Sequence, residues 1–217
     1  MASMKRSPLI VVSVVVLIAA IAAGAFWRPG NHSPIAAAAP DVSASDFGGP
    51  FSLIDQNGVR RSDSDFRGKY MLVFFGYTYC PDVCPTMLAT EAEALDKLGS
   101  RASAIVPIFI TVDPKRDTPE KLKPYLESFD PKPPSARPAF VGLTGSDEEI
   151  AKAAKAYRVY YRAHLDGQVE IGDYSVDHSS EVYLMNPEGK FVAYYSAGIL
   201  PDEMAADLQQ NTRSPTD

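Results

Sequence analysis

Continuous apolar runs alternate with amphipathic stretches along this chain, and the alternation predicts a layered α/β domain. Residues 70–75 (YMLVFF) and 104–112 (AIVPIFITV) are almost uninterrupted apolar runs, as is typical of strands buried on both faces. Pro107 stands inside the second run, and a strand tolerates proline only at its start or at a bulge. Shorter apolar stretches next to turn residues predict further strands and hairpins. They are residues 51–55 before Asn57-Gly58, residues 140–143, residues 159–176 around Asp166-Gly167, and residues 181–185 and 191–195 around residues 186–189.

Helices are predicted between these strands from apolar residues at helical spacing and from capping residues. One begins near Pro85 and places Leu88, Ala92 and Leu95 on one face. The others are residues 118–129 after Thr118-Pro119, a helix opened by the capping box Ser146-Asp147-Glu148-Glu149, and residues 201–210. Helices between buried strands come first and a hairpin comes last. This order predicts a thioredoxin-like α/β layered sandwich with a central mixed sheet.

A separate apolar run precedes this domain. Residues 9–27 form an uncharged stretch of 19 residues, roughly the length of one transmembrane helix. Lys5 and Arg6 precede it, so residues 1–8 are expected in the cytoplasm and the rest of the chain outside. The alternative is a cleaved secretory signal, although such signals carry a shorter apolar core of about 7–15 residues.

The remaining segments follow from this anchor. Residues 28–44 are rich in proline and alanine and predict a tether, residues 45–212 form the domain, and residues 213–217 form a tail. We expect a single-pass protein of the bacterial inner membrane whose domain faces the periplasm. The net charge of −6 argues against nucleic acid as a partner.

The chain has two cysteines, Cys80 and Cys84, directly after the strand at residues 70–75. Outside the cytoplasm such a pair either closes a redox-active disulfide or binds a soft metal. Three residues separate the cysteines, where the common dithiol motif has two, and this spacing favours metal. Cys84 lies beside Pro85 at a helix start, where backbone N–H groups are expected to lower the pKa of a thiolate.

His178 is the candidate third group, because it stands directly before a strand and strand ends meet at one edge of a sheet. Two thiolates and one imidazole are too few for a closed structural zinc site. They suit copper, since thiolates favour Cu(I) and the imidazole helps to hold Cu(II). His164, beside the turn of the preceding hairpin, is the other histidine of this region and is typical of a surface residue.

Three aspartates lie near these residues in the sequence. Asp113 ends the run at residues 104–112, so it either lies beside the cysteine loop or caps its own turn. Asp82 is a candidate helix cap, and Asp177 is a candidate to orient either the neighbouring His178 or the loop.

The segments FGYTYCPDVCP, ITVDPKRDTPEKL, GLTGSDEEIAKAAKAYRVYY and DYSVDHSSEVYLMNPEGKF resemble the SCO/SenC family and cover most of residues 70–192. Members are membrane-anchored thioredoxin-fold proteins that bind copper and help to metallate the dinuclear copper (CuA) centre of cytochrome c oxidase. The resemblance implies that Cys80, Cys84 and His178 bind copper and that Asp113 supports copper handling without binding the ion. It implies as partners the copper-bearing subunit of the oxidase and a periplasmic copper donor or thiol reductant. Tyr79 stands where the common family run has histidine.

Other functions use the same residues. A thiol-disulfide oxidoreductase would act through Cys80 and Cys84 on periplasmic cysteines, including those of a CuA site, and a copper or redox sensor would share every ligand. A peroxidase is disfavoured, because Val73 and Tyr77 stand where that pattern needs proline and threonine. We expect a copper-binding assembly factor that is not an enzyme, with any thiol-disulfide reductase activity accessory.

Overall fold

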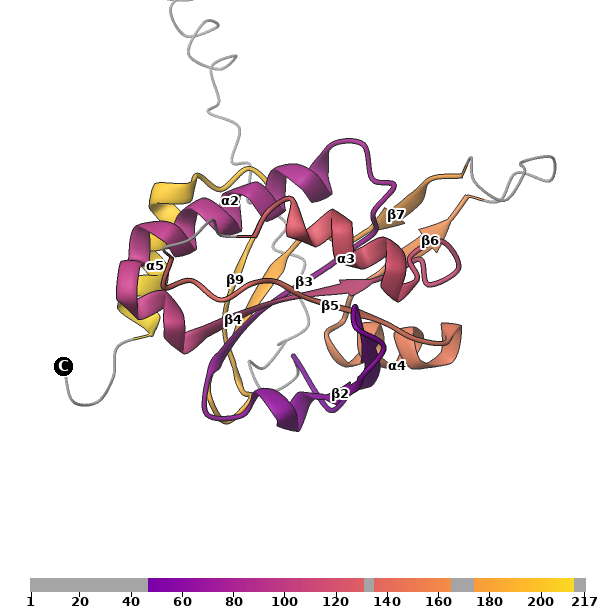
Figure 1. Cartoon of the computed structure of the whole chain (residues 1–217), viewed down its shortest axis with the longest axis horizontal. Helices are drawn as coiled ribbons and strands as arrows, with labels where there is room; N and C mark the ends of the chain where they lie inside the picture. Colours follow the sequence, from indigo (N-terminus) through magenta and orange to yellow (C-terminus); the bar gives the residue numbers. More distant parts are fainter. Residues whose placement is uncertain (1–46, 131–134, 165–173, 213–217) are drawn as a thin grey trace, which may run out of the picture. The chain divides into compact units, whose positions relative to one another are not determined.

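The computed structural model describes residues 47–130, 135–164 and 174–212 (Figure 1). Within these ranges, no helix combines the length and the apolar character that a membrane crossing requires. The predicted anchor at residues 9–27, the tether and the tail lie outside the described residues. So does the turn at Asp166-Gly167.

A seven-stranded mixed sheet forms the centre of the domain, with strand order β2-β1-β5-β4-β3-β8-β9 (Figure 1). The strands are β1 (Ser52–Asp55), β2 (Arg60–Ser62), β3 (Tyr70–Gly76), β4 (Ile105–Thr111), β5 (Val141–Thr144), β8 (Val182–Met185) and β9 (Phe191–Tyr195). β3, β4 and β5 run parallel to one another, and the other neighbours pair antiparallel. The mixed sheet predicted from the sequence is therefore confirmed.

The two long apolar runs form the central strands. β3 and β4 pair in continuous register from Tyr70 opposite Ile105 to Gly76 opposite Thr111, and every residue of β4 is buried. The expectation for Pro107 was wrong, because this proline occupies the third position of β4 and not its start. β5 pairs with β4 only from Ile108 onward, so Pro107 lies just before the part of β4 that has a neighbour on both sides.

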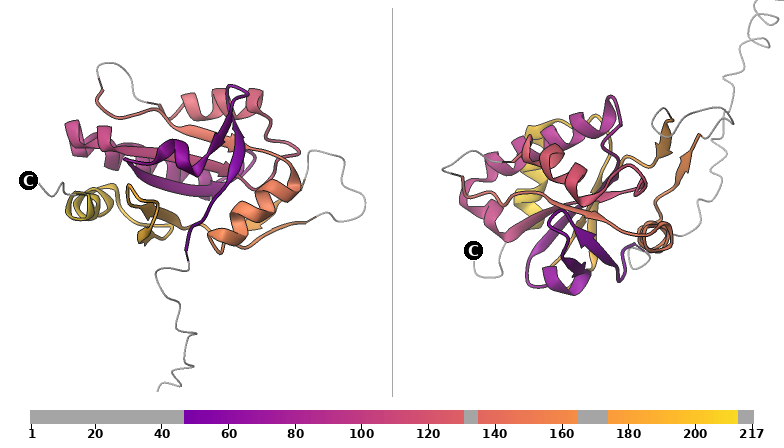
Figure 2. Two further views of the ribbon diagram at one scale, coloured as in Figure 1. Left: turned by 90° about the horizontal axis from the view of Figure 1, so that it is seen from below. Right: turned by 45° about the vertical axis from the view of Figure 1, so that its right-hand side comes forward.

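Helices flank this sheet (Figures 1 and 2). They are α2 (Val83–Leu98), α3 (Pro119–Glu127), α4 (Asp147–Ala156) and α5 (Pro201–Asn211), with short 3-10 turns η2 (Asp63–Phe66) and η3 (Gly99–Ala104). α2 and α5 lie side by side. The capping box of α4 is confirmed, since Glu149 N donates to Ser146 Oγ (3.2 Å) and Ser146 N donates to the Glu149 carboxylate (2.9 Å).

A second, two-stranded sheet consists of β6 (Tyr161–Ala163) and β7 (Val176–His178), which pair antiparallel as predicted. The pair stands apart from the large sheet in Figure 1 and in the right view of Figure 2. His178 is the last residue of β7, and Val182 begins β8 in the large sheet. His178 therefore lies at the junction between the two sheets.

Candidate metal centre

Both cysteines lie where the central strand β3 passes into α2, at the carboxyl end of the sheet. Cys84 is the second residue of α2 and fully buried, whereas Cys80 lies in the preceding loop and is partly exposed. The backbone N–H of Cys84 donates to Cys80 Sγ at 3.4 Å. Both cysteines are free thiols. α2 begins at Val83, earlier than expected. Asp82 occupies the N-cap position as expected, but its side chain makes no capping hydrogen bond.

Gly76 allows the end of β3 to lie directly against the Cys84 sulfur. A Cβ atom at this position would stand 2.8 Å from Cys84 Sγ and 2.9 Å from Phe109, closer than side-chain atoms approach one another. Sequence reasoning missed this residue. Its signal was a glycine at the end of an apolar strand, which often marks a close approach of the backbone to another group.

His178 meets the sulfurs from the second sheet. Its Nε2 lies 3.3 Å from Cys84 Sγ, and the ligand atoms of Cys80, Cys84 and His178 all lie within 4.8 Å of one another. The His178 Nδ1–H donates to the carbonyl oxygen of Ser179 at 2.8 Å. A carbonyl oxygen only accepts, so Nδ1 carries the proton and Nε2 presents its lone pair to the sulfurs.

Asp177 does not orient His178, contrary to the expectation. Its carboxylate receives a hydrogen bond from His164 Nε2 at 2.7 Å on the exposed side of the β6–β7 pair. Neighbouring residues of a strand point to opposite faces, so Asp177 faces away from the imidazole that follows it. The Ser179 carbonyl orients the ring instead, and two aromatic rings flank it at centroid distances of 5.7 Å for Tyr77 and 6.2 Å for Phe74.

The two thiols have opposite acidities. The hydrogen bond from the Cys84 thiol lowers the pKa of Cys80 to about 4. The same interaction and burial raise the pKa of Cys84 well above its usual value. The sequence predicted the lowered pKa for Cys84, and that was wrong, because a buried thiol beside an existing thiolate resists a second negative charge. The lowered pKa makes Cys80 the more nucleophilic of the two sulfurs at neutral pH.

Asp113 lies behind the cysteine loop as part of a buried ion pair. Its carboxylate accepts hydrogen bonds from Arg116 Nε and from the Tyr174 hydroxyl, the latter at 2.6 Å. Asp113 is 4% exposed. Its bonds therefore join the loop after β4 to the residues before β7.

Asp117 is a carboxylate that sequence reasoning did not single out. It is fully buried and accepts hydrogen bonds from Thr78 N (3.0 Å), Thr78 Oγ1 (2.5 Å) and Thr111 Oγ1 (2.7 Å). Burial raises its pKa. Thr78 stands two residues before Cys80, so Asp117 anchors the cysteine loop to the end of β4. Its signal in the sequence was a second aspartate in the turn that follows this buried strand.

The donor set of Cys80, Cys84 and His178 fits one soft metal ion. Thiolate and imidazole ligands bind such ions at about 2.0–2.3 Å, which places neighbouring donors about 3.5–4 Å apart. The 3.3 Å and 4.8 Å separations bracket this range, so a small closure would bring all three donors onto one ion. Two sulfurs and one nitrogen favour copper over hard cations.

Comparison with known proteins places these residues in a family. A model of the SCO1/SenC family matches residues 39–213. SenC of Rhodobacter capsulatus is 38% identical over 207 residues, covering 94% of this chain and 89% of that protein. The sco1 protein of Schizosaccharomyces pombe is 43% identical over 165 residues, covering 76% of this chain and 60% of that protein. This chain therefore spans less than two thirds of the yeast relative's length.

A solved structure is similar over the same domain. ScoI of Bradyrhizobium japonicum, determined with copper bound, is 45% identical and has a TM-score of 0.66. The alignment covers 76% of this chain and 99% of that one.

Proposed function

This chain belongs to the SCO1/SenC family, and from that premise we propose that it binds copper through Cys80, Cys84 and His178 and assists assembly of the CuA centre of cytochrome c oxidase. The observation that carries the proposal is the convergence of two sulfurs and one imidazole nitrogen within 4.8 Å. The copper-bound relative supports copper as the ion. Copper is here a cargo that the protein receives and passes on.

The site's own groups suit that task. Cys80 is already a thiolate at neutral pH, so binding has to displace a proton from Cys84 only. The two thiolates hold Cu(I), and the His178 imidazole adds the nitrogen that Cu(II) favours. Cys80 is partly exposed, which leaves one sulfur accessible to an incoming ligand from a recipient protein.

A second candidate function is reduction of disulfides in the recipient, including those of a CuA site. The acidic, accessible Cys80 beside the protonated Cys84 favours it. The Cys80 thiolate would attack the recipient disulfide, and Cys84 would then release the recipient as a dithiol. Two electrons pass to the recipient, and a Cys80–Cys84 disulfide forms.

We further propose that residues 9–27 anchor the domain to a bacterial inner membrane with the domain in the periplasm. The uncharged run and the preceding Lys5 and Arg6 support this. Recovery of the full chain in the carbonate-washed membrane fraction, with the domain open to protease in spheroplasts, is the expected result. Release of a shortened soluble chain would support the cleaved signal instead.

Copper transfer tests the main function. The copper-loaded domain is mixed with a reduced, metal-free, soluble CuA-bearing domain, and formation of the CuA absorption is followed. Cys80→Ser and Cys84→Ser are expected to abolish transfer. His178→Ala is expected to weaken Cu(II) more than Cu(I), while His164→Ala serves as the matched control on the same hairpin. The reductase function predicts a different result. The metal-free protein would reduce an oxidised recipient so that free copper can load it, and the copper-loaded protein would transfer no copper.

A further inference from the structure

His178 is fixed to the large sheet on one side only. After it, the chain enters β8 within four residues, and Val182 pairs with Phe74 of β3. Before it, the chain belongs to the separate β6–β7 sheet. The position of the imidazole relative to the sulfurs therefore depends on side-chain contacts that hold the start of β7 against the cysteine loop.

Arg116 makes the principal contacts of this kind. Its Nη1 donates to the carbonyl oxygen of Tyr174 at 2.8 Å, and its Nε donates to Asp113, which also accepts from the Tyr174 hydroxyl. The guanidinium carbon lies 3.6 Å from the centroid of the Tyr174 ring. Tyr174 is thus held through its backbone, its ring and its hydroxyl at once, two residues before β7 begins.

The same guanidinium reaches the cysteine loop. Its carbon lies 4.7 Å from the ring centroid of Tyr79, the residue before Cys80, and 5.6 Å from that of Tyr77. The Tyr77 hydroxyl in turn accepts from the backbone N–H of Val176 at 3.3 Å. The Arg116 side chain is 4% exposed, so its guanidinium is shielded from water, which strengthens its cation–π contacts and charge-assisted hydrogen bonds. Tyr79, by contrast, is 50% exposed.

We propose that Arg116 is a positioning residue for the copper site, which clamps the His178 hairpin to the cysteine loop and so sets the reach of the imidazole. The inference rests on the proposed function and names how that site distinguishes the two copper states. In this proposal Arg116 acts through Tyr174 and Tyr77 on His178. Cys84 is held separately, because it belongs to α2.

Loss of the clamp should therefore affect the two copper states unequally. Cu(I) is held mainly by the two thiolates, and Cu(II) depends more on the imidazole. Lysine at position 116 keeps a positive charge for Asp113. It lacks the planar fork that reaches Asp113 and the Tyr174 carbonyl together, and it stacks poorly on tyrosine.

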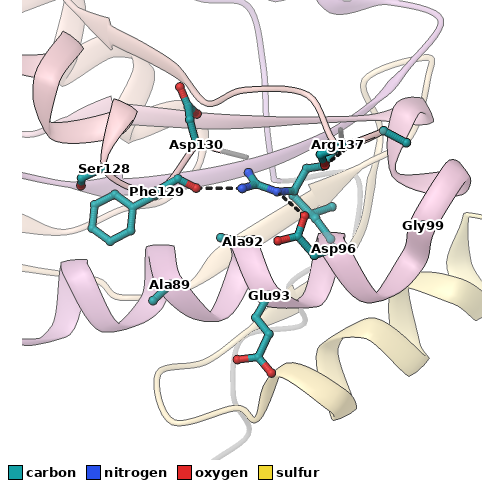
Figure 3. Close-up of a pocket in the computed structure, with 12 residues that line it drawn as sticks. Ala89, Ala92, Glu93, Asp96, Gly99, Ser128, Phe129, Asp130 and Arg137 are labelled. Atoms are coloured by element: carbon teal, nitrogen blue, oxygen red, sulfur yellow. Dashed lines mark hydrogen bonds and ion pairs between the residues drawn. The ribbon is translucent and has the colours of Figure 1, made fainter. Parts of the chain in front are cut away.

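Arg137, whose surroundings are drawn in Figure 3, provides a matched control. Its side chain is 2% exposed, and it also pairs with a carboxylate and a carbonyl, at 2.9 Å to Asp96 and 2.8 Å to the Phe129 oxygen. It lines a cavity of about 730 Å³ beside the second half of α2. Asp96 follows Cys84 by twelve residues in α2, which places it about 18 Å along the helix. Arg137→Lys thus perturbs a buried arginine with the same two kinds of partner, although the Asp96 side chain is 53% exposed, without touching the hairpin.

The test measures Cu(I) and Cu(II) affinities of wild type, Arg116→Lys and Arg137→Lys by chelator competition, with thermal unfolding of each metal-free protein. Arg116→Lys is expected to lose about 10- to 100-fold in Cu(II) affinity, the range seen when supporting residues of metal ligands are changed. Its Cu(I) affinity should fall far less, and the nitrogen coupling in its Cu(II) resonance spectrum should weaken. Arg137→Lys should leave the ratio of the two affinities unchanged.

A double-variant cycle tests the route of the effect. If Arg116 acts through the imidazole, Arg116→Lys should have no further effect on Cu(II) affinity in a His178→Ala background. An unchanged affinity ratio in Arg116→Lys, or an equal loss of both ions that follows only the unfolding temperature, overturns the proposal. Failure of wild type to bind copper, or equal binding by Cys80→Ser, would overturn the proposed function itself. When wild type binds copper and Cys80→Ser does not, the double-variant cycle tests the role of Arg116 alone.

Discussion

Substituting Gly76 by alanine places a methyl group against the sulfur of Cys84. The new Cβ would lie 2.8 Å from Cys84 Sγ and 2.9 Å from Phe109 Cε2. Opening the first distance to an ordinary contact of 3.4 Å requires a movement of about 0.6 Å. Binding sites tolerate displacements of about 0.5 Å before their geometry is lost, so the sulfur would move outside its productive position.

The expected cost has two parts. Overpacking a core costs about 1–3 kcal/mol, and alanine recovers about 0.5–1 kcal/mol relative to glycine in a strand, so the free energy of unfolding should fall by about 0.5–2 kcal/mol. Copper affinity should fall by about tenfold or more, because the displaced Cys84 no longer meets His178 at the present 3.3 Å.

Urea unfolding of the metal-free protein and chelator competition for copper measure the two effects. Gly142→Ala is the matched control, since its Cβ would stand 2.4 Å from Leu126 Cδ1 and away from any sulfur. It should lose stability and keep its copper affinity. Retention of both wild-type values by Gly76→Ala would refute the account of how the Cys84 sulfur is held.

Three further predictions concern titratable groups of the domain. Iodoacetamide should modify Cys80 but not Cys84 in the folded, metal-free protein. The rate of Cys80 modification should persist down to about pH 5, because the pKa of Cys80 is about 4. Equal labelling of the two cysteines, measured by mass spectrometry, would contradict this. Glu91 is fully buried on α2, and its carboxyl oxygens find no hydrogen-bond partner among the described residues, so burial raises its pKa well above 4.5. Compared with Glu91→Gln, the wild-type free energy of unfolding should be highest below pH 4.5. Above that pH it should fall by up to about 1.4 kcal/mol per pH unit. A difference in unfolding free energy between the two proteins that stays constant at all pH values, measured with urea, would contradict this. Asp117→Ala leaves the donors of Thr78 and Thr111 unpartnered and should cost about 2–4 kcal/mol, and an unchanged urea midpoint would exclude this anchoring role.

The order of elements was predictable because hydrophobic periodicity and capping are local properties of the sequence. β3, β8 and α4 follow from an apolar run, a turn and a capping box that each occupy a few consecutive residues. Pro107 was misjudged because the cost of a missing N–H depends on the neighbouring strand. Where β5 begins to pair is a property of the assembled sheet.

The convergence of Cys80, Cys84 and His178 was predictable from the sequence, whereas the residues that support them were not. The Cys80 and Cys84 spacing and a histidine before a strand carry chemical information by themselves. Asp117 accepts a hydrogen bond from Thr78, 39 residues away in the sequence, and Arg116 donates one to Tyr174, 58 residues away. No local sequence pattern encodes such pairings. The acidities of the thiols were reversed for a similar reason. The helix start acts on Cys84, but burial and the neighbouring Cys80 thiolate outweigh it.

The most direct test of the central claim is X-ray absorption at the copper edge of the domain loaded with one equivalent of Cu(I), alongside Cys80→Ser and His178→Ala. We expect two sulfur scatterers and a nitrogen scatterer at bonding distance from the copper ion. One sulfur should disappear in Cys80→Ser, and the nitrogen contribution should fall in His178→Ala. A copper spectrum without sulfur, or a protein that retains no copper and forms a Cys80–Cys84 disulfide, would contradict it.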